Sequence, residues 1–180
     1  VNQPLWVDYQ DGRINAQQLQ ITRFELWAQR LGVTACQINN AFLQAMADIC
    51  DVLPGARELV NALSGKANMG IITNGFTQLQ TVRLERTGMK DAFSTLVISE
   101  QVGIAKPDVG IFEYAFSQMN YPPKERILMV GDNPHSDILG GINAGIDTCW
   151  LNTTGAALPD GISPSYQVSS LNELQKILLA

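Results

Sequence analysis

The sequence predicts an open α/β sheet covered by helices on both faces, together with a smaller region that is entirely helical. Two patterns support this. From about residue 54 onward, short continuous apolar runs alternate with amphipathic stretches, which is typical of parallel strands joined by helices. Residues 1 to about 50 show only helical periodicity. The chain has 180 residues, enough for one or two domains and a sizeable core.

The helical region contains two clear helix starts. Asn15 is expected to cap a helix that ends at Gly32 and has apolar positions at Phe24, Trp27, Ala28 and Leu31. Thr34 and Gln37 form a capping box for a second helix. Its predicted apolar stripe is Ile38, Ala41, Phe42, Ala45, Met46 and Ile49. At Pro54 and Gly55 the pattern breaks, which indicates a hinge.

Four buried strands are expected in the second region, over residues 69–73, 96–99, 127–131 and 148–151. Helices are expected over residues 56–63, 76–87, 108–119, 136–144 and 171–179. Ligands of open α/β sheets bind beyond the carboxyl ends of the strands. The residues that follow each strand are therefore the first candidates for a functional site.

Composition excludes several classes of partner. Twelve Lys and Arg against 17 Asp and Glu give a net charge of -5, so no general attraction to nucleic acid or to an anionic membrane is built in. No apolar run approaches the ~20 residues of a membrane-spanning helix, and residues 1–20 are too polar for a signal peptide. The three cysteines, Cys36, Cys50 and Cys149, form no CxxC pair. We therefore expect a cytoplasmic protein with reduced thiols.

Two of the strand ends carry groups suited to an anion. Thr73, Asn74 and Gly75 follow the first strand and could form a nest of hydroxyl and backbone N–H groups, although such a triplet is also ordinary turn chemistry. After the second strand, Pro107 suits the first turn of a helix and places Lys106 just before it. Lys106 offers a compact positive charge, with a solvated surface lysine as the alternative.

The third strand leads into an acidic loop. Asp132 lies at its end and Asp137 lies five positions later, at the start of a helix. Carboxylates on a short rigid loop are typical of Mg²⁺ sites, while helix capping is an equally good explanation for Asp137. His135 is the only histidine and has no second histidine or cysteine nearby, so an exposed loop position is favoured over a metal ligand. Together the strand ends predict a Mg²⁺-assisted phosphate site.

These residues resemble the haloacid dehalogenase-like (HAD) hydrolase superfamily. Its second motif is an apolar strand ending in Thr or Ser, as at Thr73; its third is a lysine, as at Lys106; its fourth is Gly-Asp with a further Asp, as at Asp132 and Asp137. The match in order and spacing covers residues 54–152. The stretches 72–77, 83–88 and 136–145 further resemble the bacterial pyrimidine 5'-nucleotidases of this superfamily, which dephosphorylate nucleoside monophosphates.

The resemblance implies a Rossmannoid core over residues 53–180 and a helical cap over residues 1–52 that selects the substrate. It implies that Thr73, Asn74 and Gly75 bind the phosphoryl group and that Lys106 neutralises its charge. Asp132 would coordinate Mg²⁺. Asp137 would hold the loop or reach the metal indirectly, through water and Lys106.

One family motif has no counterpart. The family's aspartate nucleophile belongs to an Asp-x-Asp motif at the end of an N-terminal strand, whereas Asp8 and Asp11 follow no apolar strand and Asp48 lies on a predicted helix. A central strand contributes on the order of 10 kcal/mol of stability, close to the ~5–15 kcal/mol total of a domain. We therefore expect that the cap is N-terminally incomplete and that the first core strand lies outside residues 1–180.

The activity implied for the complete protein is Mg²⁺-dependent hydrolysis of a pyrimidine nucleoside 5'-monophosphate through a phospho-aspartyl intermediate. A phosphatase for phosphoglycolate or sugar phosphates, a 2-haloacid dehalogenase, and a non-catalytic fragment that binds Mg²⁺ and phosphate are the alternatives. In the cap, helical spacing favours core packing for Phe24 and Trp27, which leaves Trp6 and Tyr9 as freer candidates for stacking on a base. The sequence makes no prediction of the oligomeric state.

Overall fold

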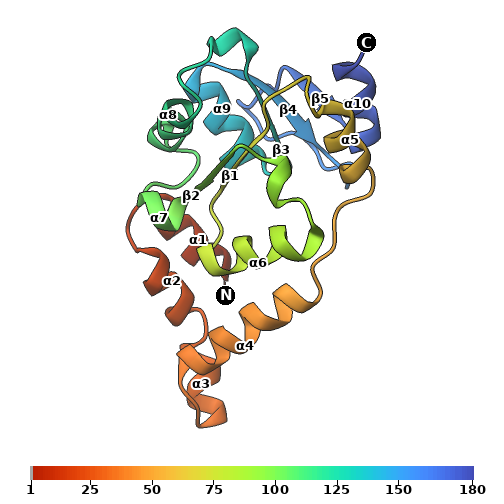
Figure 1. Ribbon diagram of the computed structural model, residues 1–180. Coiled ribbons are helices and arrows are strands. Elements are labelled where there is room, and N and C mark those ends of the chain that lie inside the picture. Colours follow the sequence, from red (N-terminus) through yellow and green to blue (C-terminus); the bar gives the residue numbers. More distant parts are fainter. Residues whose placement is uncertain (1) are drawn as a thin grey trace. The chain divides into compact units, whose positions relative to one another are not determined.

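The computed structural model describes residues 2–180, which form two compact units (Figure 1). The first unit comprises the residues up to Asp51 together with Thr73–Asp91 and Ile98–Ala105. The second comprises Val52–Ile72, Ala92–Val97 and Lys106–Ala180. Within the described part of the chain, none of the helices has the length and apolar character needed to cross a membrane.

The first unit is helical. Its helices are α1 (Asn2–Gln10), α2 (Ala16–Thr22), α3 (Glu25–Leu31), α4 (Ala35–Asp48), α6 (Thr77–Thr87) and the short α7 (Ser99–Val102). The capping boxes at Asn15 and Thr34 are confirmed, as is the end at Gly32, which adopts the left-handed conformation. The single helix expected from Asn15 to Gly32 is wrong, because it breaks at Arg23 and Phe24 into α2 and α3.

The predicted apolar stripe of α4 is wrong in part, although Met46 packs against the core of the first unit. The buried residues of this helix are Asn39, Leu43 and Ala47, whereas Phe42 is 37% exposed and Ile49 is 73% exposed. The physical reason lies in Arg23, whose guanidinium Nη2 donates to the Asn39 side chain over 2.7 Å. Asn39 shares its face of the helix with Leu43 and Ala47, which pack in the core of the first unit.

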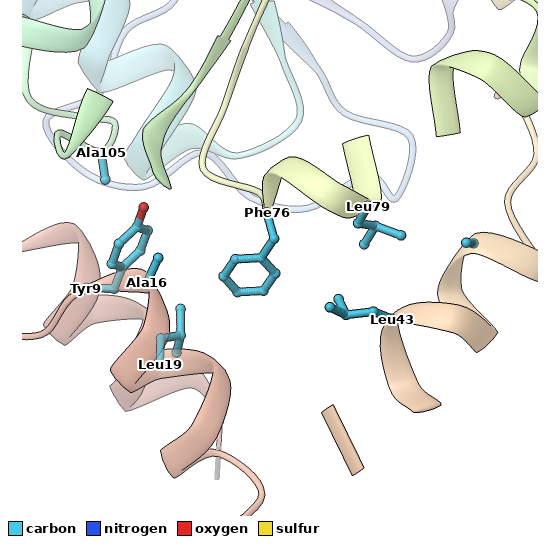
Figure 2. Packing of buried hydrophobic residues seen from close by; sticks show 8 residues of the cluster. Tyr9, Ala16, Leu19, Leu43, Phe76, Leu79 and Ala105 are labelled. Atoms are coloured by element: carbon cyan, nitrogen blue, oxygen red, sulfur yellow. The ribbon is translucent and has the colours of Figure 1, made fainter. Parts of the chain in front are cut away.

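The core of the first unit joins α1, α2 and α4 to α6 and to the segment after α7. Figure 2 shows the Phe76 ring between Leu19 of α2 and Leu43 of α4, with Leu79 of α6 nearby. Trp6 packs on the same ring at 5.7 Å between centroids, with the two ring planes inclined by 27°. Phe76, the residue just before α6, is therefore packed directly among the N-terminal helices.

The second unit carries the sheets. Its strands are β1 (Gly70–Thr73), β2 (Thr95–Ile98), β3 (Leu128–Gly131), β4 (Asp147–Leu151) and β5 (Tyr166–Val168), where β1 and β2 end within the first unit's ranges. Its helices are α5 (Ala56–Leu63), α8 (Val109–Gln118), α9 (Leu139–Ala144) and α10 (Leu171–Leu178). Single 3₁₀ turns cover Lys90–Ala92 and Lys124–Arg126, and one turn of π-helix, η3, covers Pro134–Ile138.

The strands form two sheets among the described residues. One has the order β1-β2 and the other the parallel order β3-β4-β5, with Met129 opposite Thr148 and Cys149 opposite Tyr166. β4 has partners on both sides and is buried from Thr148 to Leu151, as expected. β1 and β3 have one partner strand each, and their apolar residues are only half-buried.

Two glycines let α9 pack closely on its neighbours. A Cβ on Gly140 would lie 2.6 Å from the Phe112 ring of α8, and one on Gly141 would lie 2.6 Å from the Thr148 side chain of β4. On the opposite side of β4, Cys149 and Leu151 pack with Leu59 of α5 and Leu174 of α10. Leu128 and Val130 of β3 pack against the same cluster.

Candidate active site

The predicted site residues fall in both units. Thr73, Asn74 and Gly75 belong to the first, whereas Lys106, Asp132 and Asp137 belong to the second. Within its own unit, each set is held by contacts that the sequence pattern alone does not specify.

Lys106 is a buried cation between two strand ends. Its side chain is 8% exposed, its Nζ lies 2.7 Å from Oδ1 of Asp137, and it donates over 2.6 Å to the carbonyl oxygen of Ile72. Ile72 is the penultimate residue of β1, and Asp137 lies beyond the end of β3. The alternative of a solvated surface lysine is therefore wrong. Pro107 lies ahead of the cap residue Asp108 rather than inside the first turn of α8.

Asp137 is equally buried and has further donors. Its Oδ2 accepts from the backbone N–H of Asn133 over 3.0 Å, and its Oδ1 accepts from the Ser136 hydroxyl over 3.3 Å. Capping of this turn is performed by Asn133, whose side chain accepts from the N–H groups of His135 and Ser136. Gly131 leaves room for the Asp137 side chain, because a Cβ on that glycine would overlap it.

Asp132 is exposed, and its main chain is anchored. The buried indole of Trp150 donates from Nε1 to the Asp132 carbonyl oxygen over 3.0 Å. His135 is exposed on the same loop, as expected. No cluster of three or more potential His, Cys, Asp or Glu ligands occurs within residues 2–180. Mg²⁺ commonly takes only one or two protein carboxylates and keeps several waters. Asp132 fits such a ligand, while the Asp137 carboxylate is already occupied by Lys106, Asn133 and Ser136.

The turn after β1 is closed by its own hydroxyl. The Gly75 N–H donates to Oγ1 of Thr73 over 3.0 Å, which leaves the hydroxyl proton of Thr73 available for another acceptor. A Cβ on Gly75 would overlap the side chain of Gln80. Phe76, the cap position of α6, provides no side-chain cap, and the N–H of Thr77 donates instead to Glu100 over 2.8 Å.

Glu100 is a residue that the sequence reasoning missed. It accepts from the Thr77 N–H through Oε2 and from the Gln20 side chain through Oε1. Its position could have identified it as a candidate, because Glu100 lies two residues after the end of β2, in the segment that leads to Lys106.

The acidic residues near the N-terminus of the chain serve as ion-pair partners. Asp8 and Asp11 both contact Arg13, at 2.7 and 2.8 Å. Asp48 lies 2.7 Å from Arg86 of α6, and the hydrogen bond from Arg86 lowers the pKa of this carboxyl. None of the three follows a strand, in agreement with the sequence analysis.

Most of the aromatic residues considered for stacking on a base contact other side chains of the protein. Tyr9 is 8% exposed and donates over 2.7 Å to the Ser99 hydroxyl, and burial raises the pKa of its phenol. Trp6 stacks on Phe76. The expectation of core packing for Trp27 is wrong, because this residue is 52% exposed. Phe24 packs on Phe42 at 5.5 Å between ring centroids.

Several known proteins are similar to this chain in sequence and in fold. The chain is 59% identical over 178 residues to the pyrimidine 5'-nucleotidase YjjG of Escherichia coli (strain K12), covering 99% of the chain and 79% of that protein. It is 34% identical to the pyrimidine 5'-nucleotidase PynA of Streptococcus pneumoniae (strain ATCC BAA-255 / R6), covering 97% and 75%.

Among solved structures, a magnesium-bound crystal form of the HAD-hydrolase YfnB from Bacillus subtilis superposes with a TM-score of 0.89 at 29% identity, covering 99% of this chain and 79% of that one. A family model for hydrolases of the haloacid dehalogenase-like type matches residues 6–145. The strand-end lysine, threonine and aspartates thus occur in a chain that belongs to the haloacid dehalogenase-like hydrolase family.

Proposed function

We propose that this protein is a Mg²⁺-dependent, cytoplasmic phosphatase that hydrolyses pyrimidine nucleoside 5'-monophosphates. The observation that carries the proposal is the buried Lys106, paired with Asp137 at 2.7 Å beside a loop on which the Asp132 carboxylate remains exposed. A fixed cation and a free carboxylate on adjoining strand ends suit a phosphate dianion and a divalent metal. The substrate class is inferred from the two pyrimidine 5'-nucleotidases to which the chain is similar.

The proposal assigns one role to each predicted site residue. Thr73, through its hydroxyl, and the backbone of Asn74 and Gly75 bind the phosphoryl oxygens. The Gly75 N–H, which donates to Oγ1 of Thr73 in this structure, would exchange that acceptor for a phosphoryl oxygen. Lys106 stabilises the charge that develops on those oxygens. When bound, Mg²⁺ would be held in part by Asp132 and would supply further charge neutralisation at the phosphate. Asp137 keeps the Lys106 ammonium in place and contributes no bond to the substrate.

The nucleophile in this proposal is an aspartate of the family's Asp-x-Asp motif. It attacks phosphorus while the P–O5' bond breaks and the general acid/base of the same motif protonates the nucleoside oxygen. Water then cleaves the phospho-aspartyl bond, which releases phosphate and restores the aspartate. Residues 1–52 would form the cap over the site and residues 53–180 the core. Asp8, Asp11 and Asp48 are not assigned this role, because none of them follows a strand.

A substrate panel tests the proposal. We expect the protein, purified as its gene encodes it, to hydrolyse deoxyuridine or thymidine monophosphate faster than phosphoglycolate or sugar phosphates, and to lose activity with EDTA. A Lys106→Met variant should lose at least ~100-fold in kcat/KM, since one charged contact to a transition-state oxygen contributes about 3 kcal/mol. Equal rates on all phosphoesters would contradict the preference for pyrimidine nucleotides and leave the phosphatase activity standing. Halide release without metal, or no turnover of any phosphoester, would overturn the phosphatase.

A further inference from the structure

A continuous chain of side-chain hydrogen bonds in the first unit ends at the start of α6. Arg23 donates to Asn39 over 2.7 Å, Asn39 donates to Gln20 over 3.1 Å, and Gln20 donates to Glu100 over 2.8 Å. The second oxygen of Glu100 accepts the backbone N–H of Thr77 over 2.8 Å. The chain thereby connects α2 and α4 with α7 and with the residue that opens α6.

The last bond of this chain lies where α6 needs it. The first N–H groups of a helix have no partner within the helix and depend on a cap. Phe76 cannot supply one, and the Glu100 carboxylate takes that place from a different element. Asn74 and Gly75, whose backbone would bind phosphate, immediately precede Phe76. The direction of their N–H groups therefore depends on how the start of α6 is held.

The other end of this series of hydrogen bonds is the buried guanidinium of Arg23. Arg23 is 6% exposed, and its guanidinium carbon lies 4.7, 4.7 and 5.2 Å from the ring centroids of Phe24, Phe42 and Phe76. Its Nε has no hydrogen-bond partner in the structure. Asn39, which is 5% exposed, accepts from the guanidinium through its side-chain oxygen and donates through its amide nitrogen to Gln20. Gln20 and Glu100 are half-buried, so the cost of a misplaced buried polar group falls mainly on Arg23 and Asn39 and favours the orientation in which Asn39 serves both partners.

We propose that Glu100 is a positioning residue for phosphate binding, oriented by Gln20, so that helices α2 and α4 set the geometry of the Thr73–Phe76 turn. The inference rests on the proposed phosphatase function and assigns to the N-terminal helices a role beyond enclosing the substrate. Glu100 acts through the backbone of Thr77 and touches no substrate atom.

The donors and acceptors of the chain provide a direct test. Glu100 faces two donors, so Glu100→Gln must lose one hydrogen bond, because its amide nitrogen cannot accept. Gln20→Glu places a carboxylate against the Glu100 carboxylate and loses the same bond. The double variant Q20E/E100Q restores every bond: residue 20 then accepts from Asn39 and from residue 100, whose amide oxygen accepts from Thr77.

The measurements are KM, kcat and the inhibition constant of inorganic phosphate, on the protein as its gene encodes it. We expect each single variant to raise KM and the phosphate inhibition constant roughly tenfold, the value of one hydrogen bond to a charged group. The double variant should return both to within about threefold of wild type. Gln44→Glu is the matched control, since Gln44 makes the same kind of bond to Asp48 at an exposed site of α4, and it should change neither constant.

The sign of the effect separates geometry from charge. Removing the Glu100 charge would by itself strengthen the binding of an anion, so a lower inhibition constant in E100Q overturns the proposal. A double variant no better than the worse single variant also overturns it. Melting temperatures identify a variant that fails to fold. If Glu100→Gln does not fold, the comparison of Gln20→Glu with wild type tests the proposal. If the wild-type protein binds phosphate in calorimetry without hydrolysing any ester, the proposed phosphatase function fails. The positioning role of Glu100 is then still decided by comparing the phosphate affinities of the same variants.

Discussion

At the scale of single residues, the contacts of Lys106 explain why a lone lysine can define a site. The sequence places Lys106, Asp132 and Asp137 after the predicted strands. In the structure Asp132 directly follows β3 and Asp137 lies in η3, whereas α7 separates Lys106 from the end of β2. The sequence pattern could not show which roles Asp132 and Asp137 have. Capping and metal binding both fit Asp137 from its position, and only the three-dimensional structure shows that Asn133 caps the turn while Asp137 pairs with Lys106.

This pairing leads to a stability prediction. Asp137→Asn should lower the free energy of unfolding by about 3–5 kcal/mol, because it leaves a buried ammonium without its carboxylate. Urea unfolding of the variant would measure the change. The control is Glu113→Gln, which breaks a pair with Lys124 at 3.2 Å whose side chains are 45% and 49% exposed, and which should cost no more than about 1 kcal/mol. Equal losses in the two variants would mean that burial adds nothing to the Lys106 pair.

At the scale of elements, local signals predicted helix ends better than helix faces. Capping residues such as Asn15 and Thr34 act within four residues of their partners, so the sequence contains the whole interaction. The inward face of α4 depends instead on partners distant in sequence, since Asn39 accepts from Arg23 at the end of α2 and Leu43 packs in a cluster with Phe76. β5 escaped prediction because it is only three residues long and obtains its register from β4.

The close packing of α9 predicts an unusual response to alanine. In a helix, Gly→Ala ordinarily stabilises by up to about 1 kcal/mol. At Gly140 and Gly141 the new methyl would meet Phe112 and Thr148, and overpacking of about 1–3 kcal/mol should outweigh that gain. Thermal unfolding of G140A and G141A should therefore show lower midpoints than wild type. Asn143→Ala, at an exposed site of the same helix, should stay within about 0.5 kcal/mol; stabilised glycine variants would contradict the packing argument.

At the scale of the whole molecule, the division of the strands into two sheets bears on the strand expected from the family resemblance. Among the strands described, β1 and β3 each have a single partner, and both are half-buried although their sequences are continuously apolar. Lys106 links Ile72 near the end of β1 to Asp137 in the loop after β3. The expected Asp-x-Asp strand stays a prediction, and the interval between β1 and β3 is where it would pair.

Hydrogen exchange tests this expectation. In the protein as its gene encodes it, the amides of Ile71 and Met129 should exchange as slowly as those of β4, because a strand between β1 and β3 would pair with both. In a chain limited to residues 1–180, the same amides should exchange faster. β5, at the far edge of its sheet, serves as the internal control and should behave alike in both proteins. Identical exchange of β1 and β3 in the two proteins would exclude the pairing.

The bond between the Trp150 indole and the Asp132 carbonyl has an optical consequence. Trp150 is 2% exposed, whereas Trp27 is 52% exposed, so their fluorescence should differ in colour and in access to quenchers. Because the indole donates to the main chain of the loop that carries Asp132, any displacement of that loop alters the surroundings of a buried fluorophore. The protein thus contains its own spectroscopic reporter of events at the acidic loop, readable without a label.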